Sequence, residues 1–148
     1  MATTFTKVFV HIIFHTKSSS VKINEKDLPE IFRYIGGVIH SMSGVAHMVG
    51  GRPDHVHILS TLPISLSLGD FIRSIKSNSS RWIKSLDAEY HGFAWQRGYG
   101  AFSVSTSQVR TVVDYIRNQK EHHRIHSADE ELLLFLKKNG LENMVTNE

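Results

Sequence analysis

The sequence has 148 residues, no cysteine and a formal net charge of +3. This length suits one domain with a full hydrophobic core, so we expect residues 1–148 to form a single domain. The lack of cysteine excludes disulfides, thiolate zinc sites and thiol nucleophiles. No apolar run approaches the roughly 18 residues of a membrane span, and the first residues lack the order of regions of a signal peptide. We therefore expect a soluble, cytoplasmic protein with no membrane partner.

Histidine is unusually frequent, with ten residues in the chain. Imidazole groups bind metal ions, transfer protons and contact phosphate, so each of these chemistries becomes a hypothesis. The mildly positive charge permits a polyanionic partner such as nucleic acid but does not require one.

The first half of the chain predicts three strands and one helix. Residues 5–16 are β-branched and aromatic, and their run VFVHIIF favours the centre of a sheet. Residues 25–44 carry apolar side chains at helical spacing and end at a glycine. Two short strands, residues 45–51 and 54–62, flank a Gly-Gly-Arg-Pro turn and predict a hairpin.

The second half predicts three helices and one strand. Residues 67–86 have an amphipathic helical pattern, and residues 101–105 predict a fourth strand. Residues 106–123 predict a helix, with Ser105 and Gln108 spaced as a capping box. Residues 127–141 predict a last helix whose acidic first turn complements the helix dipole.

This order of elements, β-α-β-β-α-β followed by appended C-terminal helices, predicts an α+β fold. It is the split β-α-β, ferredoxin-like plan, in which an antiparallel sheet carries its helices on one face. The plan hosts many functions, including plain RNA binding, so it does not identify one.

The strand at residues 54–62 contains the sequence DHVHIL. Side chains alternate across a strand, so His55 and His57 point to one face, roughly 6.6 Å apart along the chain, and Val56 points to the core. Two imidazoles so placed can bind one metal ion. Two core histidines, each hydrogen-bonded to backbone, would give the same pattern, and the pair alone does not decide.

The predicted helix at residues 106–123 supplies further candidates. Tyr115 and Gln119 are four residues apart and share one helix face. A tyrosine that fills the core is the alternative reading. Here, however, an amide oxygen follows one turn later, and then the basic sequence KEHHR, in which Lys120 and His122 are candidates for phosphate contact.

His55, His57 and Gln119 together offer two nitrogens and one oxygen, all uncharged. Such a set leaves the full charge of a divalent ion available to an anion, which suits phosphoryl chemistry. It suits structural zinc poorly, because closed zinc sites prefer four cysteine or histidine ligands.

Residues 73–97 carry five basic residues against two acidic ones, interleaved with Trp82, Phe93, Trp95 and Tyr99. Basic groups beside exposed rings suit single-stranded or hairpin nucleic acid. A solvated helix face with aromatic rings in the core is the alternative, and we expect Trp82 to pack in the core. The residues that we expect to contact phosphate are Lys76, Arg81 and Arg97.

The remaining histidines have weaker patterns. His11 and His15 share one face of the first strand. His11 either lines the site, supports one of its ligands from behind, or belongs to the core. The others are a hairpin residue, His47, and three that we interpret as surface residues, His40, His91 and His126.

Four motifs together resemble the single-tyrosine HUH transposases of small insertion sequences and their REP-associated relatives. They are HIIFHTK near the start, GGRPDHVHIL, WQRGYGAFSVS, and DYIRNQKEHH with its tyrosine and glutamine four apart. Each motif alone is common, but their order over about residues 5–125 is specific. The serine-rich turn KSSSVKI departs from the more basic turn expected of relatives, and the sequence beyond Ser127 matches nothing specific.

The resemblance implies a metal-dependent DNA transposase in which His55, His57 and Gln119 bind Mg²⁺ or Mn²⁺ and Tyr115 is the nucleophile. Its substrate would be single-stranded DNA with hairpins at the element ends. Attack by Tyr115 would leave a 5′-phosphotyrosine and a free 3′-hydroxyl, and another 3′-hydroxyl could then rejoin the strand. The resemblance also implies a homodimer in which the tyrosine helix of one subunit can complete the partner's metal site.

Two other functions fit parts of the pattern. A non-catalytic or domesticated module of the same fold, binding DNA or RNA hairpins, needs neither the metal nor Tyr115. A small metal-dependent hydrolase would use His55 and His57 with water as the nucleophile. The tyrosine–glutamine pair favours the transposase, because neither alternative needs it.

Overall fold

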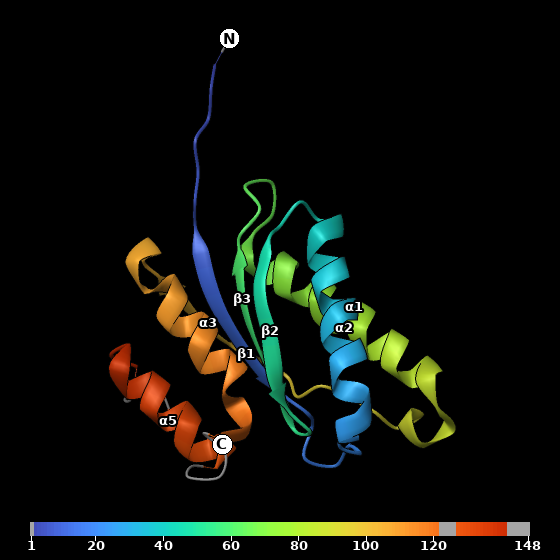
Figure 1. Ribbon diagram of the computed structural model, residues 1–148. Helices are drawn as coiled ribbons and strands as arrows, with labels where there is room; N and C mark the ends of the chain where they lie inside the picture. The colour runs from blue at the N-terminus through green and yellow to red at the C-terminus, as the bar shows by residue number, and fades with distance from the viewer. Residues whose placement is uncertain (1, 122–126, 142–148) are drawn as a thin grey trace.

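The computed structural model describes residues 2–121 and 127–141, and Figure 1 shows its elements. The strands are β1 (Phe9–His15), β2 (Ala46–Arg52), β3 (His55–Thr61) and β4 (Gly100–Val104). The helices are α1 (Leu28–Ser41), α2 (Leu68–Leu86), α3 (Val109–Arg117) and α5 (Ala128–Lys138). Within these residues we find no helix with the length and apolarity needed to cross a membrane.

The four strands form one antiparallel sheet in the order β2-β3-β1-β4. This is the strand order of the split β-α-β plan, so the predicted α+β, ferredoxin-like fold is confirmed. β1 lies between β3 and β4, where its first six residues, five of them apolar, are all buried.

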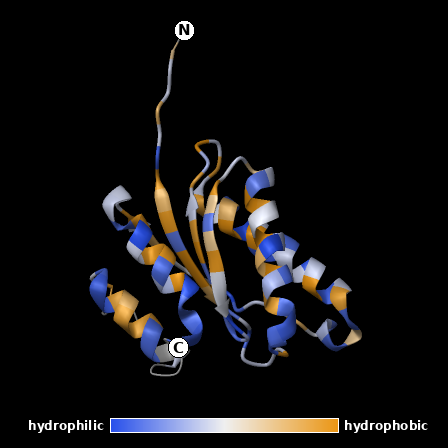
Figure 2. Ribbon diagram, viewed as in Figure 1, coloured by the Kyte–Doolittle hydropathy of each residue, from blue (hydrophilic) through white to orange (hydrophobic). Residues whose placement is uncertain are grey.

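Helices cover both faces of this sheet (Figure 1). The two helices of the β-α-β units, α1 and α2, pack on one face over the main core, which includes Ile12, Phe14, Val56 and Ile58. The appended helices α3 and α5 lie on the opposite face. Figure 2 shows apolar residues along the strands, between the two helical layers. The second face of the sheet is therefore enclosed, and side chains that point to it meet the appended helices.

The first strand is shorter than predicted. β1 begins at Phe9 rather than at residue 5, because Phe9 already pairs with Thr61, the last residue of β3. Beyond this point the sheet offers little to pack against, and the side chain of Phe5 is 90% exposed.

The tyrosine-bearing helix also has different ends. α3 begins at Val109, and Thr106–Gln108 form a separate 3₁₀ turn. The predicted capping box is wrong, because Ser105 makes no side-chain hydrogen bond to the turn's backbone and its Oγ instead lies 3.3 Å from Ser107 Oγ. α3 ends at Arg117, two residues before Gln119.

Candidate active site

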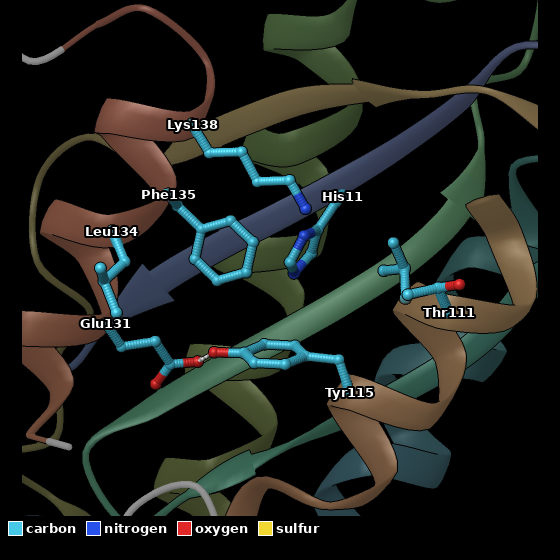
Figure 3. A pocket seen from close by; sticks show the side chains of 8 residues that line it. His11, Thr111, Tyr115, Glu131, Leu134, Phe135 and Lys138 are labelled. Atoms are coloured by element: carbon cyan, nitrogen blue, oxygen red, sulfur yellow. Dashed lines mark hydrogen bonds between the residues drawn. The ribbon is translucent and has the colours of Figure 1, made fainter. Parts of the chain in front are cut away.

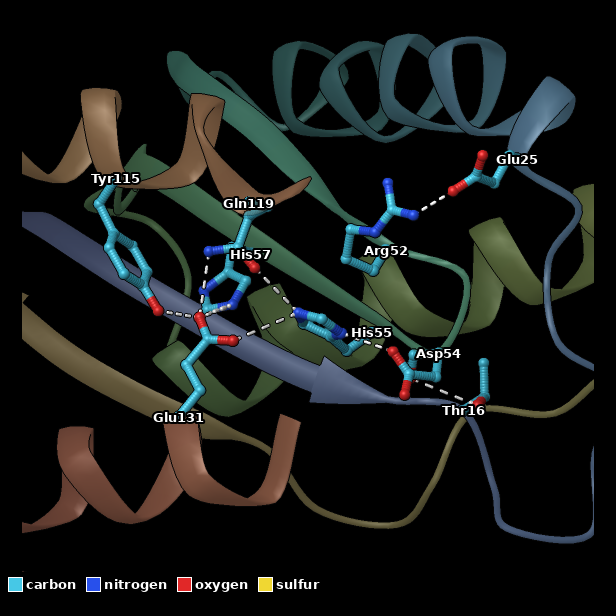
Figure 4. Close-up of polar contacts among 9 residues, drawn as sticks. All are labelled: Thr16, Glu25, Arg52, Asp54, His55, His57, Tyr115, Gln119 and Glu131. Atoms are coloured by element: carbon cyan, nitrogen blue, oxygen red, sulfur yellow. Dashed lines mark hydrogen bonds and ion pairs between the residues drawn. The ribbon is translucent and has the colours of Figure 1, made fainter. Parts of the chain in front are cut away.

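The two histidines of β3 point to the face that α3 and α5 cover, and both are almost fully buried. Their Nε2 atoms point toward the same group of side chains (Figure 4). Behind them, His55 Nδ1 lies 2.7 Å from Asp54 Oδ1, and His57 Nδ1 lies 2.9 Å from His11 Nε2. Each ring is thus held at one nitrogen while the other faces the site, an arrangement typical of metal-binding histidines.

A glycine in β2 lets the end of α3 approach this face of the sheet. A Cβ atom at Gly50 would lie 2.7 Å from Ile116 Cγ2 and 2.9 Å from the Ile116 carbonyl oxygen. Real Cβ atoms do not tolerate such contacts, so only glycine allows α3 to rest on β2 at this point. This close contact places the residues that follow Ile116 next to β3.

Gln119 is buried and reaches the predicted histidine pair from the end of α3. Its Oε1 lies 3.0 Å from His55 Nε2, and its Nε2 donates a hydrogen bond of 3.0 Å to Glu131 Oε1. The structure therefore brings together the three residues that the resemblance proposes as metal ligands.

Tyr115 lies beside the same group, one turn earlier on α3. Its ring meets the ring of His57 edge to face, with centroids 5.7 Å apart, and its hydroxyl donates a hydrogen bond to Glu131 Oε1 (Figure 4). All of these side chains belong to a single chain.

The acidic residue at the centre of the site, Glu131, is not predicted by any of the sequence motifs. It is buried, and its carboxylate contacts Tyr115, Gln119 and His57, whose Nε2 lies 2.8 Å from Oε1. From the sequence, the acidic residues at the start of this helix are explained by favourable interaction with the helix dipole. In the structure, Ser127 Oγ caps α5 and Glu131 lies on the helix face turned toward the sheet. The sequence does offer one indication that Glu131 is buried: it lies four residues before the apolar Phe135 and so shares a helix face with it.

Burial and hydrogen bonds fix the charges of the site. Burial lowers the pKa of His57 to about 4, although contact with Glu131 acts in the opposite direction. Burial would raise the pKa of Glu131, but the contact with His57 and the hydrogen bonds from Tyr115 and Gln119 outweigh it and hold this pKa below its usual range. Burial and the Glu131 carboxylate raise the pKa of the Tyr115 phenol. At neutral pH the site therefore holds a neutral His57 imidazole, a Glu131 carboxylate and a protonated Tyr115 phenol.

The side chains present fit a divalent metal ion. One ligand atom from each of His55, His57 and Glu131 can be chosen so that all lie within 4.8 Å of one another. The Gln119 amide oxygen lies beside them. Two imidazole nitrogens with carboxylate and amide oxygens form a donor set that suits Mn²⁺, and Mg²⁺ through its oxygens.

The predicted phosphate contacts are placed differently from one another. Lys76 donates hydrogen bonds to the carbonyl oxygens of Gln96 and Gly98, at 2.7 and 2.8 Å, and so holds the loop before β4. Arg97 is exposed on that loop and shares a hollow with Lys76. Arg81 is exposed on α2 outside this hollow.

Two more predicted phosphate contacts follow Gln119. Lys120 is exposed beside the hairpin of β2 and β3. His122 lies outside the described residues.

Most of the aromatic rings of residues 73–97 are packed inside. Phe93 and Trp95 are buried, and Trp95 lies edge to face with Phe14 and donates through Nε1 to Ser79 Oγ. The interpretation of these rings as an exposed stacking surface is wrong, because Phe14 of the central strand draws them into the core. Trp82 is half-buried and stacks on Tyr34. Of the four rings, Tyr99 is the exposed one.

The other histidines divide between this face and the surface. His11 is buried behind His57, and His15 stacks on His55 with ring centroids 5.4 Å apart. His47 is exposed and lies edge to face with Phe9. His40 and His91 are exposed as predicted, and His126 lies outside the described residues.

Comparison with known proteins relates this site to one family. The model of the family described as IS200-like transposases matches residues 4–119. This range contains His55, His57, Tyr115 and Gln119 and ends before Glu131. No curated protein matches the sequence.

Two solved structures share the fold. A suspected transposase from Deinococcus radiodurans R1 is 19% identical, with a TM-score of 0.61 over 80% of this chain and 95% of that one. A REP-associated tyrosine transposase, solved bound to a REP hairpin, is 18% identical, with a TM-score of 0.60 over 83% of this chain and 73% of that one.

Proposed function

The chain belongs to the IS200-like transposases, and we propose that it is a metal-dependent enzyme that cleaves and rejoins single-stranded, hairpin-bearing DNA ends. The observation that carries this proposal is the position of the Tyr115 hydroxyl, which shares the Glu131 carboxylate with His57 and Gln119. A carboxylate that only satisfied the hydroxyl of a packed tyrosine would not need to contact His57 and Gln119 as well.

The proposed reaction exchanges one phosphodiester bond for another. Tyr115 Oη attacks the scissile phosphorus, the bond between phosphorus and O3′ breaks, and the DNA keeps a 3′-hydroxyl after O3′ takes a proton from solvent. The phenolic proton passes to Glu131, which accepts it in a hydrogen bond, as the bond to phosphorus forms, because that bond makes the proton on Oη far more acidic. The resulting 5′-phosphotyrosine retains the energy of the cleaved bond, because phenolate is a better leaving group than an alkoxide. A second 3′-hydroxyl can therefore rejoin the strand without ATP.

The proposed ligands of the divalent ion are His55, His57 and Gln119, with Glu131 within reach of both histidines. When bound, the ion would polarise the scissile phosphate and neutralise the charge that develops on it. Asp54 and His11 hold the outer nitrogens of the two rings and so fix which nitrogen faces the site.

DNA is the proposed partner, and a basic hollow next to the histidines supports it. The hollow has a volume of about 760 Å³ and is lined by His15, Lys17, Lys22 and Arg97, among others. It shares Arg97 with the hollow next to Lys76, so the two adjoin. Cations along such a path suit the phosphates of a single strand. The related structure bound to a REP hairpin is consistent with a hairpin as the recognised end.

Three further parts of the proposal concern the assembly of the protein. We take residues 1–148 to be one domain, since α5 supplies Glu131 to a site that is otherwise built within residues 4–119. The homodimer implied by the family resemblance stays a prediction. The arrangement within one chain favours a site completed by its own tyrosine.

The test is formation of a covalent protein–DNA adduct. Purified protein is incubated with Mg²⁺ and labelled single strands that carry the palindromes flanking its gene, beside a Tyr115→Phe variant. We expect a denaturant-resistant adduct with wild type and none with the variant. Equal labelling of the two proteins would remove Tyr115 as the nucleophile.

The same assay separates the alternatives. Hairpin binding that is unaffected by chelator and by Tyr115→Phe, without any adduct, would indicate a non-catalytic binding module. Repeated strand cleavage by the Tyr115→Phe variant would indicate a hydrolase that uses water.

A further inference from the structure

Another cavity lies beside the Tyr115 ring, between α3 and α5 (Figure 3). Its volume is about 340 Å³, and its walls are mainly apolar. The walls come from β1, from α3 and above all from α5, which contributes Glu131, Leu134, Phe135 and Lys138. These α5 residues lie beyond the family match at residues 4–119, so the family comparison does not account for this cavity.

Three rings meet in the cavity. Phe135 lies edge to face with His11, at a centroid distance of 4.9 Å, and with Tyr115, at 5.2 Å. From the sheet side, Phe102 stacks on Phe135 at 5.9 Å and supports it. The rings are therefore fixed by their neighbours, and they offer aromatic surface to a flat ligand.

The polar groups are few and placed at the edges. His11 is almost fully buried, and its Nε2 shares a hydrogen bond with His57 Nδ1. No described residue forms a hydrogen bond with His11 Nδ1. If His57 Nε2 faces a metal ion, His57 Nδ1 carries the proton and donates it to His11 Nε2. The proton of His11 then lies on Nδ1, where it can be donated to a ligand.

One cation stands at the mouth of the cavity. Lys138 extends toward His11 (Figure 3), and no carboxylate of the described residues pairs with it. An apolar, aromatic interior with one ammonium group at its rim is complementary to a planar uncharged ring attached to a phosphate. A nucleotide has this combination.

We propose that this cavity binds the nucleobase of a nucleotide adjoining the scissile phosphate, stacked on Phe135 and edge to face with Tyr115, with Lys138 on a neighbouring backbone phosphate. The inference rests on the proposed function, because Tyr115 joins the cavity to the reacting phosphate. It adds a base-recognition site that is built largely by α5.

Binding in EDTA tests the proposal without the reaction. The affinities of the wild-type and Phe135→Ala proteins are measured for two kinds of single strand. One kind has all its bases, and the other lacks the base at one of the positions flanking the cut. We expect Phe135→Ala to bind the complete strand about 5- to 150-fold more weakly, the range of one aromatic–base stack. One abasic position should weaken wild type to a similar extent and leave Phe135→Ala unaffected.

Controls separate loss of the stack from loss of structure. Phe135→Tyr retains the ring and should restore affinity, and Leu133→Ala changes an exposed residue of the same helix outside the cavity. Equal weakening of complete and abasic strands by Phe135→Ala would overturn the proposal. An adduct in the Tyr115 assay together with that result would leave the transposase function intact, whereas base-dependent binding without any adduct would retain the cavity and reject the reaction.

Discussion

The hydroxyl of Tyr115 donates a hydrogen bond to the carboxylate of Glu131. Glu131 belongs to α5, outside the range of the family match, yet the same carboxylate contacts Gln119 and His57. One acidic side chain thus links the proposed nucleophile to the proposed metal ligands. Its negative charge and its ability to take up a proton can be tested directly.

Glu131→Gln should slow the cleavage of DNA. Glutamine has nearly the same size but cannot accept the phenolic proton, and positioned proton transfer contributes about 10²- to 10⁴-fold to rates. We expect the initial rate of adduct formation with Mg²⁺ to fall at least about a hundredfold, while hairpin binding in EDTA persists. Glu130→Gln, at an exposed position of the same helix, should react like wild type. A Glu131→Gln protein as fast as wild type would show that the carboxylate takes no part.

The positions of His55 and His57 could be predicted from the sequence, whereas those of Glu131 and Trp95 could not. Strand alternation places His55 and His57 on one face, because this rule depends only on neighbouring residues. The role of Glu131 depends on the face of the sheet on which a terminal helix packs, and its own spacing does not reveal that. The same limit explains Trp95: its sequence neighbours are basic, but its contact with Phe14, from the central strand, decides its burial.

Gly50→Ala should disturb the site by changing the contact between β2 and α3. The added Cβ would collide with the side chain and carbonyl oxygen of Ile116, so α3 must move away from β2 and carry Gln119 away from His55. Overpacking of this kind costs about 1–3 kcal/mol of unfolding free energy. Urea unfolding should show this loss, and adduct formation should fall with it.

The chain offers a matched control for this substitution. Gly37 lies inside α1, and a Cβ there meets nothing within 4 Å. Gly37→Ala should therefore stabilise the protein, by up to about 1 kcal/mol, because alanine is the better helix former. A Gly50→Ala protein as stable and as active as wild type would show that α3 need not contact β2 so closely.

Arg97→Gln should weaken binding to single-stranded DNA through charge alone. Arg97 is exposed where the two hollows adjoin, whereas the Lys76 ammonium is engaged by two carbonyl oxygens. The negative slope of log affinity against log salt should become shallower by roughly 0.7, the value for one phosphate contact on a single strand. Arg33→Gln, at an exposed position of α1, should leave the slope unchanged. An unaltered slope for Arg97→Gln would place the DNA elsewhere.

Tyr90 should make the stability of the fold sensitive to alkaline pH. Its hydroxyl donates to Asp27 Oδ2 at 2.5 Å and accepts from the backbone amide of Asn24 at 2.9 Å, joining the start of α1 to the segment after α2. Burial and the Asp27 carboxylate raise the pKa of Tyr90 to about 12, against about 10 in an unfolded chain.

The sign of the effect follows from proton binding. Between these two pKa values the folded state keeps the phenolic proton and the unfolded state loses it. The contribution is therefore complete below about pH 10 and is lost as the pH rises toward about 12. Urea unfolding from about pH 8 to about pH 11.5 should show a decline that is smaller in Tyr90→Phe, which also loses about 1 kcal/mol at neutral pH with its hydrogen bonds. Tyr99→Phe, at an exposed ring, should decline like wild type, and parallel curves for Tyr90→Phe and wild type would show that this hydroxyl does not hold its proton through folding.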